Sequence, residues 1–248
     1  MKTPFSGSVM KNSKTDIVYI YKKMLNTDEL RYSLRSVEKN WPHRNIWVIG
    51  DRLDWFSDNI RVLPIKTNPD LRPYKDVNFK LLMACREEEI SEDFWFFNDD
   101  FFIMSRINPR KFLPYRDDTL VSRQRYLMKQ RRLGRDNQYI ESFESAIDIL
   151  DRLKCSTQYN YETHCPFLFN KSRLEWLVDD FNENGCRRSI YGNYFKVPAS
   201  EHKDCKIYGI NEKVNLFNPV ISTSDLAFSG LAGRVIKQQF KEKSRYER

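Results

Sequence analysis

Two adjacent carboxylates flanked by large apolar residues form the part of this 248-residue sequence best suited to chemistry. Asn98, Asp99 and Asp100 follow Phe96–Phe97 and precede Phe101–Phe102. Burying unpaired carboxylates beside aromatic rings is costly, and a divalent cation offsets that cost. Mg²⁺ is typically bound by one or two carboxylates together with substrate phosphate oxygens. The motif therefore predicts a nucleotide site with Mn²⁺ or Mg²⁺ bound by Asp99 and Asp100. The alternative is a solvated turn whose aspartates cap the next element.

Two further motifs carry residue types that act on hydroxyl groups or phosphates. His164, in the run YETHCP, is a candidate general base or phosphate ligand, although a lone histidine is more often structural. Ser224 and Asp225 end the hydroxyl-rich run STSD. This run could cap a helix, or it could hold a sugar hydroxyl or a phosphate.

Basic residues gather between positions 123 and 135. The chain has 42 Lys and Arg against 34 Asp and Glu, a net charge of +8, which points toward polyanionic partners. The segment could follow a nucleic-acid backbone, or it could be a solvated helix face. The candidate nucleic-acid-binding residues are Arg123, Arg125, Lys129, Arg131, Arg132 and Arg135.

Several classes of protein are excluded by what the sequence lacks. It contains no P-loop, no glycine-rich dinucleotide fingerprint, no zinc-protease helix motif and no nucleophile elbow. No apolar run approaches the length of a transmembrane span, and the first sixteen residues contain no signal-peptide core. The five cysteines include no C-x-x-C pair, which favours a reducing compartment, and we expect a cytoplasmic protein.

The elements that must position these residues can be read from hydrophobic patterns. Alternating strands and helices predict an α/β fold with a mostly parallel central sheet and flanking helices. Asp51 and the Asn98–Asp100 motif both follow predicted strands, where ligands bind in such sheets. The second half is predicted to be more helical. We expect strands at 16–21, 46–49, 60–65 and 94–97, and helices at 26–41, 77–89, 140–150 and 172–181. From Asp225 onward we expect a loop that enters a basic helix ending at Arg248.

No linker divides the chain, so we expect one domain at 16–248 behind a flexible leader at 1–15. Capping residues are predicted at Asn26 for the first helix and at Ser172 for a later one.

Several blocks together resemble the Stealth family of sugar-phosphate transferases, and more closely a compact group of phage-encoded, glycosyltransferase-like proteins. The resemblance covers most of residues 16–248, and its specificity lies in the order of the blocks. These blocks are DIVY from Asp16, ELRYSLRSVEK from Glu29, IWVIGD from Ile46, FNDDFF from Phe97, YETHCP from Tyr161, FNK from Phe169 and STSD from Ser222.

The resemblance implies a GT-A-like fold with a nucleotide-sugar half at about 16–105 and an acceptor half at about 106–248. The Asn98–Asp100 motif would take the place of the metal-binding D-x-D motif, and His164 would match the histidine block. The first Stealth block normally continues with a Trp-Val-Asp-Gly type of run, whereas this chain has Ile20–Lys23 there. The long insertions of cellular Stealth proteins are also missing. Both departures favour simple glycosyl transfer over hexose-1-phosphate transfer.

The leading hypothesis is a metal-dependent glycosyltransferase that uses a nucleotide-diphosphate sugar. The acceptor would be a hydroxymethylated base in phage DNA, or otherwise a surface glycan. The alternatives are a Stealth-like sugar-1-phosphate transferase and a non-catalytic nucleic-acid-binding protein. His164 and Asp100 are the predicted catalytic residues, and the predicted donor-binding residues are Lys22, Arg31, Arg35, Asp51, Asn98, Ser224 and Asp225.

Overall fold

The computed structural model describes residues 15–23, 28–134, 139–181 and 185–248. Residues 1–14 of the predicted leader, the predicted cap Asn26 and the predicted nucleic-acid-binding residue Arg135 lie outside these ranges. No helix in the described part of the chain is both long and apolar enough to cross a membrane.

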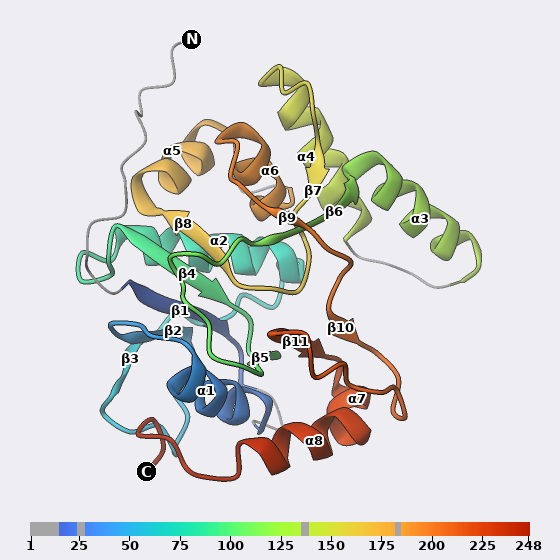
Figure 1. Cartoon of the computed structure of the whole chain (residues 1–248). Coiled ribbons are helices and arrows are strands. Elements are labelled where there is room, and N and C mark those ends of the chain that lie inside the picture. The colour runs from blue at the N-terminus through green and yellow to red at the C-terminus, as the bar shows by residue number, and fades with distance from the viewer. Residues whose placement is uncertain (1–14, 24–27, 135–138, 182–184) are drawn as a thin grey trace.

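A five-stranded sheet with the order β3-β2-β1-β4-β8 forms the centre of the fold (Figure 1). The first four strands are parallel, and β8 pairs antiparallel with β4. Apolar and aromatic side chains fill both faces, as in parallel sheets covered by helices on both sides. The strands are β1 (Asp16–Tyr21), β2 (Ile46–Gly50), β3 (Ile60–Leu63), β4 (Asp93–Phe97) and β8 (Phe167–Asn170).

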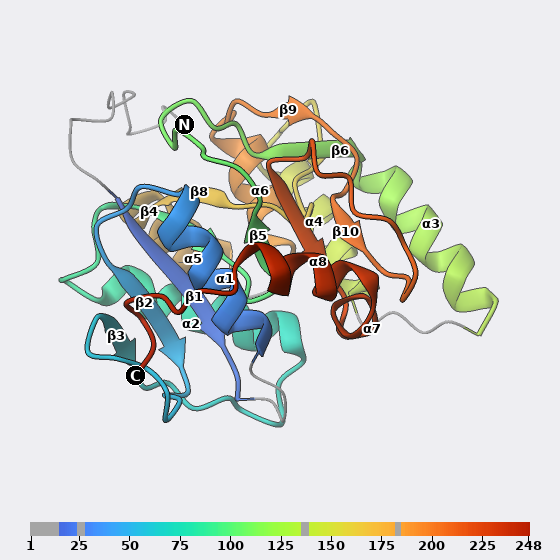
Figure 2. The same cartoon turned by 60° about the horizontal axis from the view of Figure 1, so that its bottom comes forward.

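Helices cover both faces of this sheet, as the alternating sequence pattern predicts. Helix α1 (Asp28–Asn40) packs Leu34 and Val37 against one face of the sheet. Helices α2 (Pro73–Arg86) and α5 (Lys171–Phe181) cover the other face. Figure 2 shows α1 lying along the strands on its side of the sheet. The predicted α/β class, with a mostly parallel central sheet and flanking helices, is confirmed.

A glycine ends β2 beside the carboxyl end of β1. Gly50 has a φ of +139°, and a Cβ atom there would lie 1.8 Å from the carbonyl oxygen of Tyr21. Only glycine tolerates both the conformation and this close approach. The chain can therefore leave the sheet directly at Asp51.

A second sheet continues from the end of β4. Strand β5 (Phe101–Ile103) pairs antiparallel with β11 (Val220–Thr223), which pairs parallel with β10 (Lys206–Ile207). Helices α7 (Asp225–Ser229) and α8 (Leu231–Gln239) pack on this sheet through Phe228 and Ile236. The second sheet thus brings residues from the end of the chain to the Asn98–Asp100 turn.

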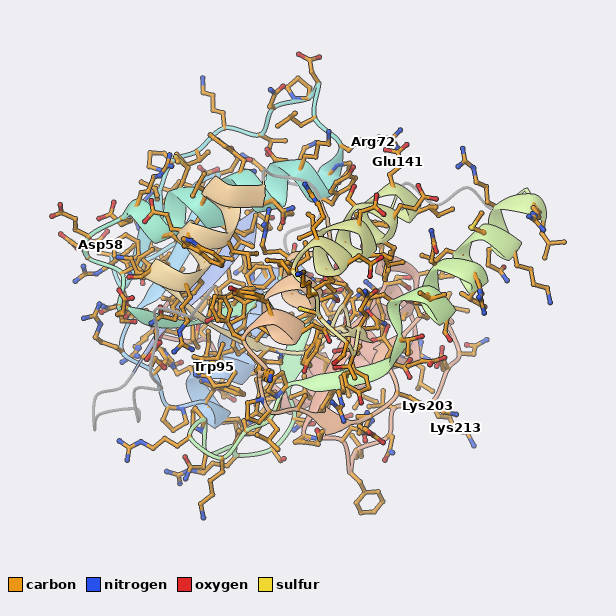
Figure 3. All side chains as sticks on the ribbon, turned by 90° about the horizontal axis from the view of Figure 1, so that it is seen from above. Asp58, Arg72, Trp95, Glu141, Lys203 and Lys213 are labelled. Atoms are coloured by element: carbon orange, nitrogen blue, oxygen red, sulfur yellow. The ribbon has the colours of Figure 1, made fainter. Side chains whose placement is uncertain are left out.

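The rest of the C-terminal half is mostly helical. Helices α3 (Leu120–Arg132), α4 (Ile140–Arg152) and α6 (Arg187–Tyr194) share a core with part of α5. A small sheet of β7 (Tyr159–Asn160), β6 (Tyr115–Thr119) and β9 (Ser200–Glu201) lies beside them. Figure 3 shows Arg72 and Glu141 side by side; this pair, 2.8 Å from Nη2 to Oε1, joins the start of α2 to the start of α4.

Most predicted elements are present, with three local corrections. The helix predicted at 77–89 begins earlier, at Pro73, because proline fits the first turn of a helix. Ser172 is not a cap: its hydroxyl donates to Glu92, while Asn170 accepts from the backbone N–H of Arg173. The helix predicted to run to position 248 ends at Gln239. The predicted division near residue 105 stays a prediction.

Candidate active site

The Asn98–Asp100 motif forms the turn between β4 and β5. The backbone N–H of Phe101 donates to the carbonyl of Asn98 at 3.3 Å and closes the turn. Because Phe97 and Phe101 are fully buried on either side, the polar residues between them are fixed in place. The turn leaves the sheet at the carboxyl end of β4, where ligands bind in α/β folds.

Asp100 is buried and only half of its carboxylate is paired. Its Oδ2 atom accepts from Lys206 Nζ at 2.8 Å and from Ser222 Oγ at 2.9 Å. Its Oδ1 atom has no hydrogen-bond partner among the described residues. A buried carboxylate oxygen without a partner is costly unless a ligand binds it. These contacts also argue against the alternative in which Asp100 caps a following element.

The neighbouring carboxyl groups hold protons near neutral pH. Burial, followed by the negative charge of Asp100, raises the pKa of Asp99 to about 7. Burial and the charges of Asp100, Asp99 and Asp225 raise the pKa of Glu29 to about 8. The hydroxyl of Thr223 donates to Glu29 at 2.8 Å and acts in the opposite direction. The cluster is therefore crowded with negative charge that protein groups neutralise only in part.

A cavity of about 1100 Å³ opens over this cluster. It extends from the ends of β1 and β4 to α2 and the start of α7. Lys80 forms part of its wall, buried and bound to Asp76 at 2.8 Å and to Thr67 at 2.6 Å. The volume is large enough for a nucleotide linked to a sugar, since ligand cavities commonly range from about 300 to 1,000 Å³.

The acidic residues fit a divalent cation that shares its ligands with a substrate. No group of three or more His, Cys, Asp or Glu side chains within the described ranges is arranged to hold a metal ion by itself. Mg²⁺ commonly takes one or two carboxylates and completes its shell with substrate phosphates and water. The unpartnered Oδ1 of Asp100 and the carboxyl of Asp99 are the atoms suited to that role.

A smaller cavity of about 390 Å³ lies on the other side of Asn98 and contains His164. The Nδ1 atom of His164 lies 2.8 Å from both carboxylate oxygens of Asp204. Burial alone would raise the pKa of Asp204, but the hydrogen bonds and charge of His164 outweigh it and lower the pKa to about 2. A carboxylate on one ring nitrogen orients the other nitrogen for proton transfer. Asn98, Tyr139 and Lys206 line both cavities, so the two cavities meet at these residues.

The structure brings together only some of the predicted donor-binding residues. Lys22, Asn98, Ser224 and Asp225 all line the larger cavity. Ser224 also caps α7, because its hydroxyl accepts from the backbone N–H of Ala227 at 3.2 Å. Asp51 is not among the lining residues; its carboxylate accepts from the backbone N–H of Lys23 at 2.7 Å and holds the end of β1.

Arg31 and Arg35, two further predicted donor-binding residues, bind Glu247 and lie outside both cavities. Arg35 donates to both oxygens of Glu247, at 2.7 and 2.8 Å, and Arg31 donates to Glu247 at 3.1 Å. Arg35 also donates to the carbonyls of Phe240 and Lys241. Neither arginine lines a cavity described above, because both point from α1 toward the final residues. The structure therefore places both arginines away from the two cavities, and their binding of phosphate stays a prediction.

Helix α3 carries the predicted basic segment. Arg123 reaches the rim of the smaller cavity. The remaining described members, Arg125, Lys129, Arg131 and Arg132, are exposed. Only Leu120 and Leu127 of this helix are buried, and Figure 1 shows it projecting away from the central sheet. Its role in binding nucleic acid stays a prediction.

Sequence reasoning missed three residues of the site. Glu29 is only the first residue of the ELRYSLRSVEK block in the sequence, and no sequence pattern singles out Lys206 or Asp204. The clearest local signal is that Asp204 and Lys206 flank the buried Cys205, because polar residues on both sides of a buried residue are typical of a strand with one buried face. Their partners His164 and Asp100 lie 40 and 106 residues away, beyond any local pattern.

Comparisons with known proteins give similar structures but no family. No protein-family model matches the chain. A search of curated proteins found no match either. The chain is similar to the glycosyltransferase GlyE of Streptococcus pneumoniae TIGR4, with 11% identity and a TM-score of 0.39 over 78% of this chain and 46% of that one. It therefore spans less than half of GlyE.

It is also similar to the galactosyltransferase LgtC, solved in complex with donor and acceptor sugar analogues. The identity is 10% and the TM-score is 0.49, over 93% of this chain and 96% of that one. The resemblance to Stealth proteins and to phage proteins stays a prediction.

Proposed function

We propose that this chain is a metal-dependent glycosyltransferase that moves a sugar from a nucleotide-diphosphate sugar to an acceptor hydroxyl. The observation that carries the proposal is the meeting of two cavities at Asn98 and Lys206. One contains a carboxylate cluster suited to a cation and a diphosphate, and the other contains a histidine held by a carboxylate. A transferase needs such a pair of sites, because donor and acceptor must react across a shared boundary.

The donor would lie in the larger cavity. Lys22, at the end of β1, would neutralise phosphate charge. Ser224 and Asp225, at the start of α7, would contact the donor or the acceptor. Asp99 and Asp100 would hold the divalent cation, which when bound neutralises the diphosphate and stabilises it as a leaving group.

The acceptor hydroxyl would lie in the smaller cavity beside His164. In the transfer, the acceptor oxygen forms a bond to the anomeric carbon while the bond from that carbon to the phosphate oxygen breaks. The hydroxyl proton passes to His164 Nε2, and the nucleoside diphosphate leaves. Asp204 orients His164 through Nδ1 and stabilises the imidazolium that forms.

The first test is a thermal-shift screen of nucleotide sugars, each with and without Mn²⁺. A ligand at about 100 times its dissociation constant stabilises a fold by about 2.7 kcal/mol. We expect one nucleotide sugar to stabilise the chain only when Mn²⁺ is present, and turnover to release a nucleoside diphosphate. Release of a nucleoside monophosphate would instead identify the sugar-1-phosphate transferase. Absence of any nucleotide-dependent shift would contradict the donor site.

For the acceptor we propose DNA carrying a hydroxymethylated base, with a surface glycan as the alternative. The supporting observation is the exposed basic face of α3, one end of which reaches the smaller cavity at Arg123. A target base would have to leave its stack to reach His164. Transfer to a duplex containing 5-hydroxymethylcytosine should weaken steeply as salt rises. Transfer to a glycan but not to this duplex would favour the alternative.

A non-catalytic nucleic-acid-binding protein makes a different prediction. Its DNA binding would survive replacement of both Asp99 and Asp100 by alanine, and no sugar would be transferred. We place the proposed activity in the cytoplasm; the five free thiols support a reducing compartment.

A further inference from the structure

Lys206 occupies a special position between the two cavities. It lies on the short strand β10, lines both cavities, and places Nζ 2.8 Å from Asp100 Oδ2. The side chain is 18% exposed, so its ammonium group is held in place with little access to water.

Other basic residues of the larger cavity do not share this role. Lys80 is bound to Asp76, and Lys22 is exposed at the end of β1. Among the described basic side chains, Lys206 alone forms an ion pair with a member of the Glu29, Asp99 and Asp100 cluster. Before any ligand binds, the ammonium group of Lys206 is therefore the positive charge that contacts the carboxylates of this cluster.

We propose that Lys206 takes the place of the divalent cation until the donor arrives, so that the cation enters together with the diphosphate and not alone. This inference depends on the proposed function, because the diphosphate supplies the ligand oxygens that the protein lacks. Like charges held a few ångströms apart in a partly buried site repel each other, because little water screens them. A divalent cation at Asp100 Oδ1 would therefore be opposed by the ammonium at Oδ2. A bound diphosphate offers that ammonium a second anionic partner.

The test is a calorimetric titration of the full chain with MnCl₂ in the absence of nucleotide. Lys206→Met removes the competing charge, and we expect it to bind Mn²⁺ at least about tenfold more tightly than the wild type, or about 1.4 kcal/mol. Lys206→Arg keeps the charge and should stay within about threefold of the wild type. Lys22→Met is the matched control, because it removes a lysine of the same cavity that does not contact Asp100.

An unchanged or weaker Mn²⁺ affinity in Lys206→Met would overturn the inference. If this variant does not fold, Lys206→Gln gives the same comparison, because its amide can still donate to Asp100 without a charge. Inorganic pyrophosphate separates this inference from the proposed function. Tighter Mn²⁺ binding by Lys206→Met, with no pyrophosphate binding to any variant at saturating Mn²⁺, would support the competition between Lys206 and the cation but contradict the donor site, and with it the joint entry of cation and diphosphate. Pyrophosphate binding to the wild type, with unchanged Mn²⁺ affinity in Lys206→Met, would support the donor site and contradict the inference about Lys206.

Discussion

Helix α1 contributes charged side chains to two regions of the molecule whose carboxylates are in opposite states. At its start, Glu29 joins Asp99 and Asp100, and the pKa of Glu29 is raised to about 8 by burial and like charges. Further along, Arg31 and Arg35 bind Glu247. Burial alone would raise the pKa of Glu247, but Arg35 and the backbone of Ser244 outweigh it and lower the pKa to about 2.

The opposite pKa shifts distinguish two uses of charge. The Glu247 region uses ion pairs to stabilise the fold, whereas the carboxylates of the cavity are left for a ligand to neutralise. The Glu247 carboxylate is fully buried, yet each of its oxygens accepts hydrogen bonds from an arginine. In the cavity cluster Asp100 is buried and Glu29 and Asp99 are half-buried, but they lack equivalent partners, so they repel one another. A fold tolerates such repulsion at a functional site because a substrate or cation relieves it.

The largest expected effect is on turnover, at the cavity cluster. Asp99→Asn should reduce glycosyl transfer by about 10³-fold or more, because losing a proposed metal ligand would remove several kcal/mol of transition-state stabilisation. Its stability should not fall, because Asn resembles the protonated carboxyl that burial and the charge of Asp100 favour at this position. Initial rates at saturating Mn²⁺ measure the loss of transfer, and urea unfolding measures the stability. Asp58→Asn, at an exposed position, is the control, and more than a tenth of wild-type activity in Asp99→Asn would contradict the comparison.

The second effect is on stability, at the other end of α1. Glu247→Gln should lower the free energy of unfolding by about 3–5 kcal/mol, because it leaves the charge of Arg35 buried without its partner. Urea unfolding measures this change. The rate per folded molecule should stay the same, since Glu247 lines neither cavity. Glu242→Gln removes an exposed carboxylate and is the matched control. Equal stability of the Glu247→Gln and Glu242→Gln variants would show that the ion pairs of Glu247 do not stabilise the fold.

The third effect is a dependence of stability on pH. Asp99 and Glu29 have ordinary pKa values of 3.8 and 4.5 and folded values of about 7 and about 8. The folded state therefore holds more protons than the unfolded state, so stability is greatest at the acidic end of this window and falls as pH rises through it. The slope is at most about 1.4 kcal/mol per pH unit for each carboxyl. The contribution of Glu247 has the opposite sign and is lost only as pH falls toward 2.

Urea unfolding of the metal-free chain between pH 5 and 8 tests this sign. Glu29→Gln should flatten the decline, whereas Glu242→Gln should leave it unchanged. If the free energy of unfolding falls equally steeply with pH in the wild type and both variants, Glu29 does not cause the decline.

The smallest expected effect concerns the hydrogen bond from Thr223 to Glu29, which partly offsets the repulsion among the cavity carboxylates. Thr223→Val removes the donor to Glu29 and should cost about 1 kcal/mol of stability at pH 6. The loss should be larger at pH 9, where Glu29 is ionised and its hydrogen bonds are stronger. Chemical unfolding at both pH values measures the difference. Ser229→Ala, which removes an exposed hydroxyl, is the control. No difference between the pH values would mean that Glu29 does not ionise in this range.

Local sequence patterns predicted the elements but not the partners of the charged residues. The β-branched and aromatic runs at 16–21 and 46–49 and the apolar spacing of α1 are local signals, and each yielded the right element. The motif at Asn98–Asp100 could be placed at a strand end for the same reason. The partner of Arg35 lies 212 residues away, and nothing in the neighbourhood of either residue indicates it. A charged side chain looks the same in sequence whether it binds phosphate or a distant glutamate.

The bond between Arg35 and Glu247 also bears on how the chain reaches its native state. It closes a loop of 212 residues, and contacts at such separation form slowly because the entropy of the intervening chain must be lost first. During synthesis, α1 and the strands beside it emerge long before residue 247 and must persist with two unpaired arginines. The N-terminal strands can therefore pair early, whereas the final consolidation of α1 waits until residue 247 has been made.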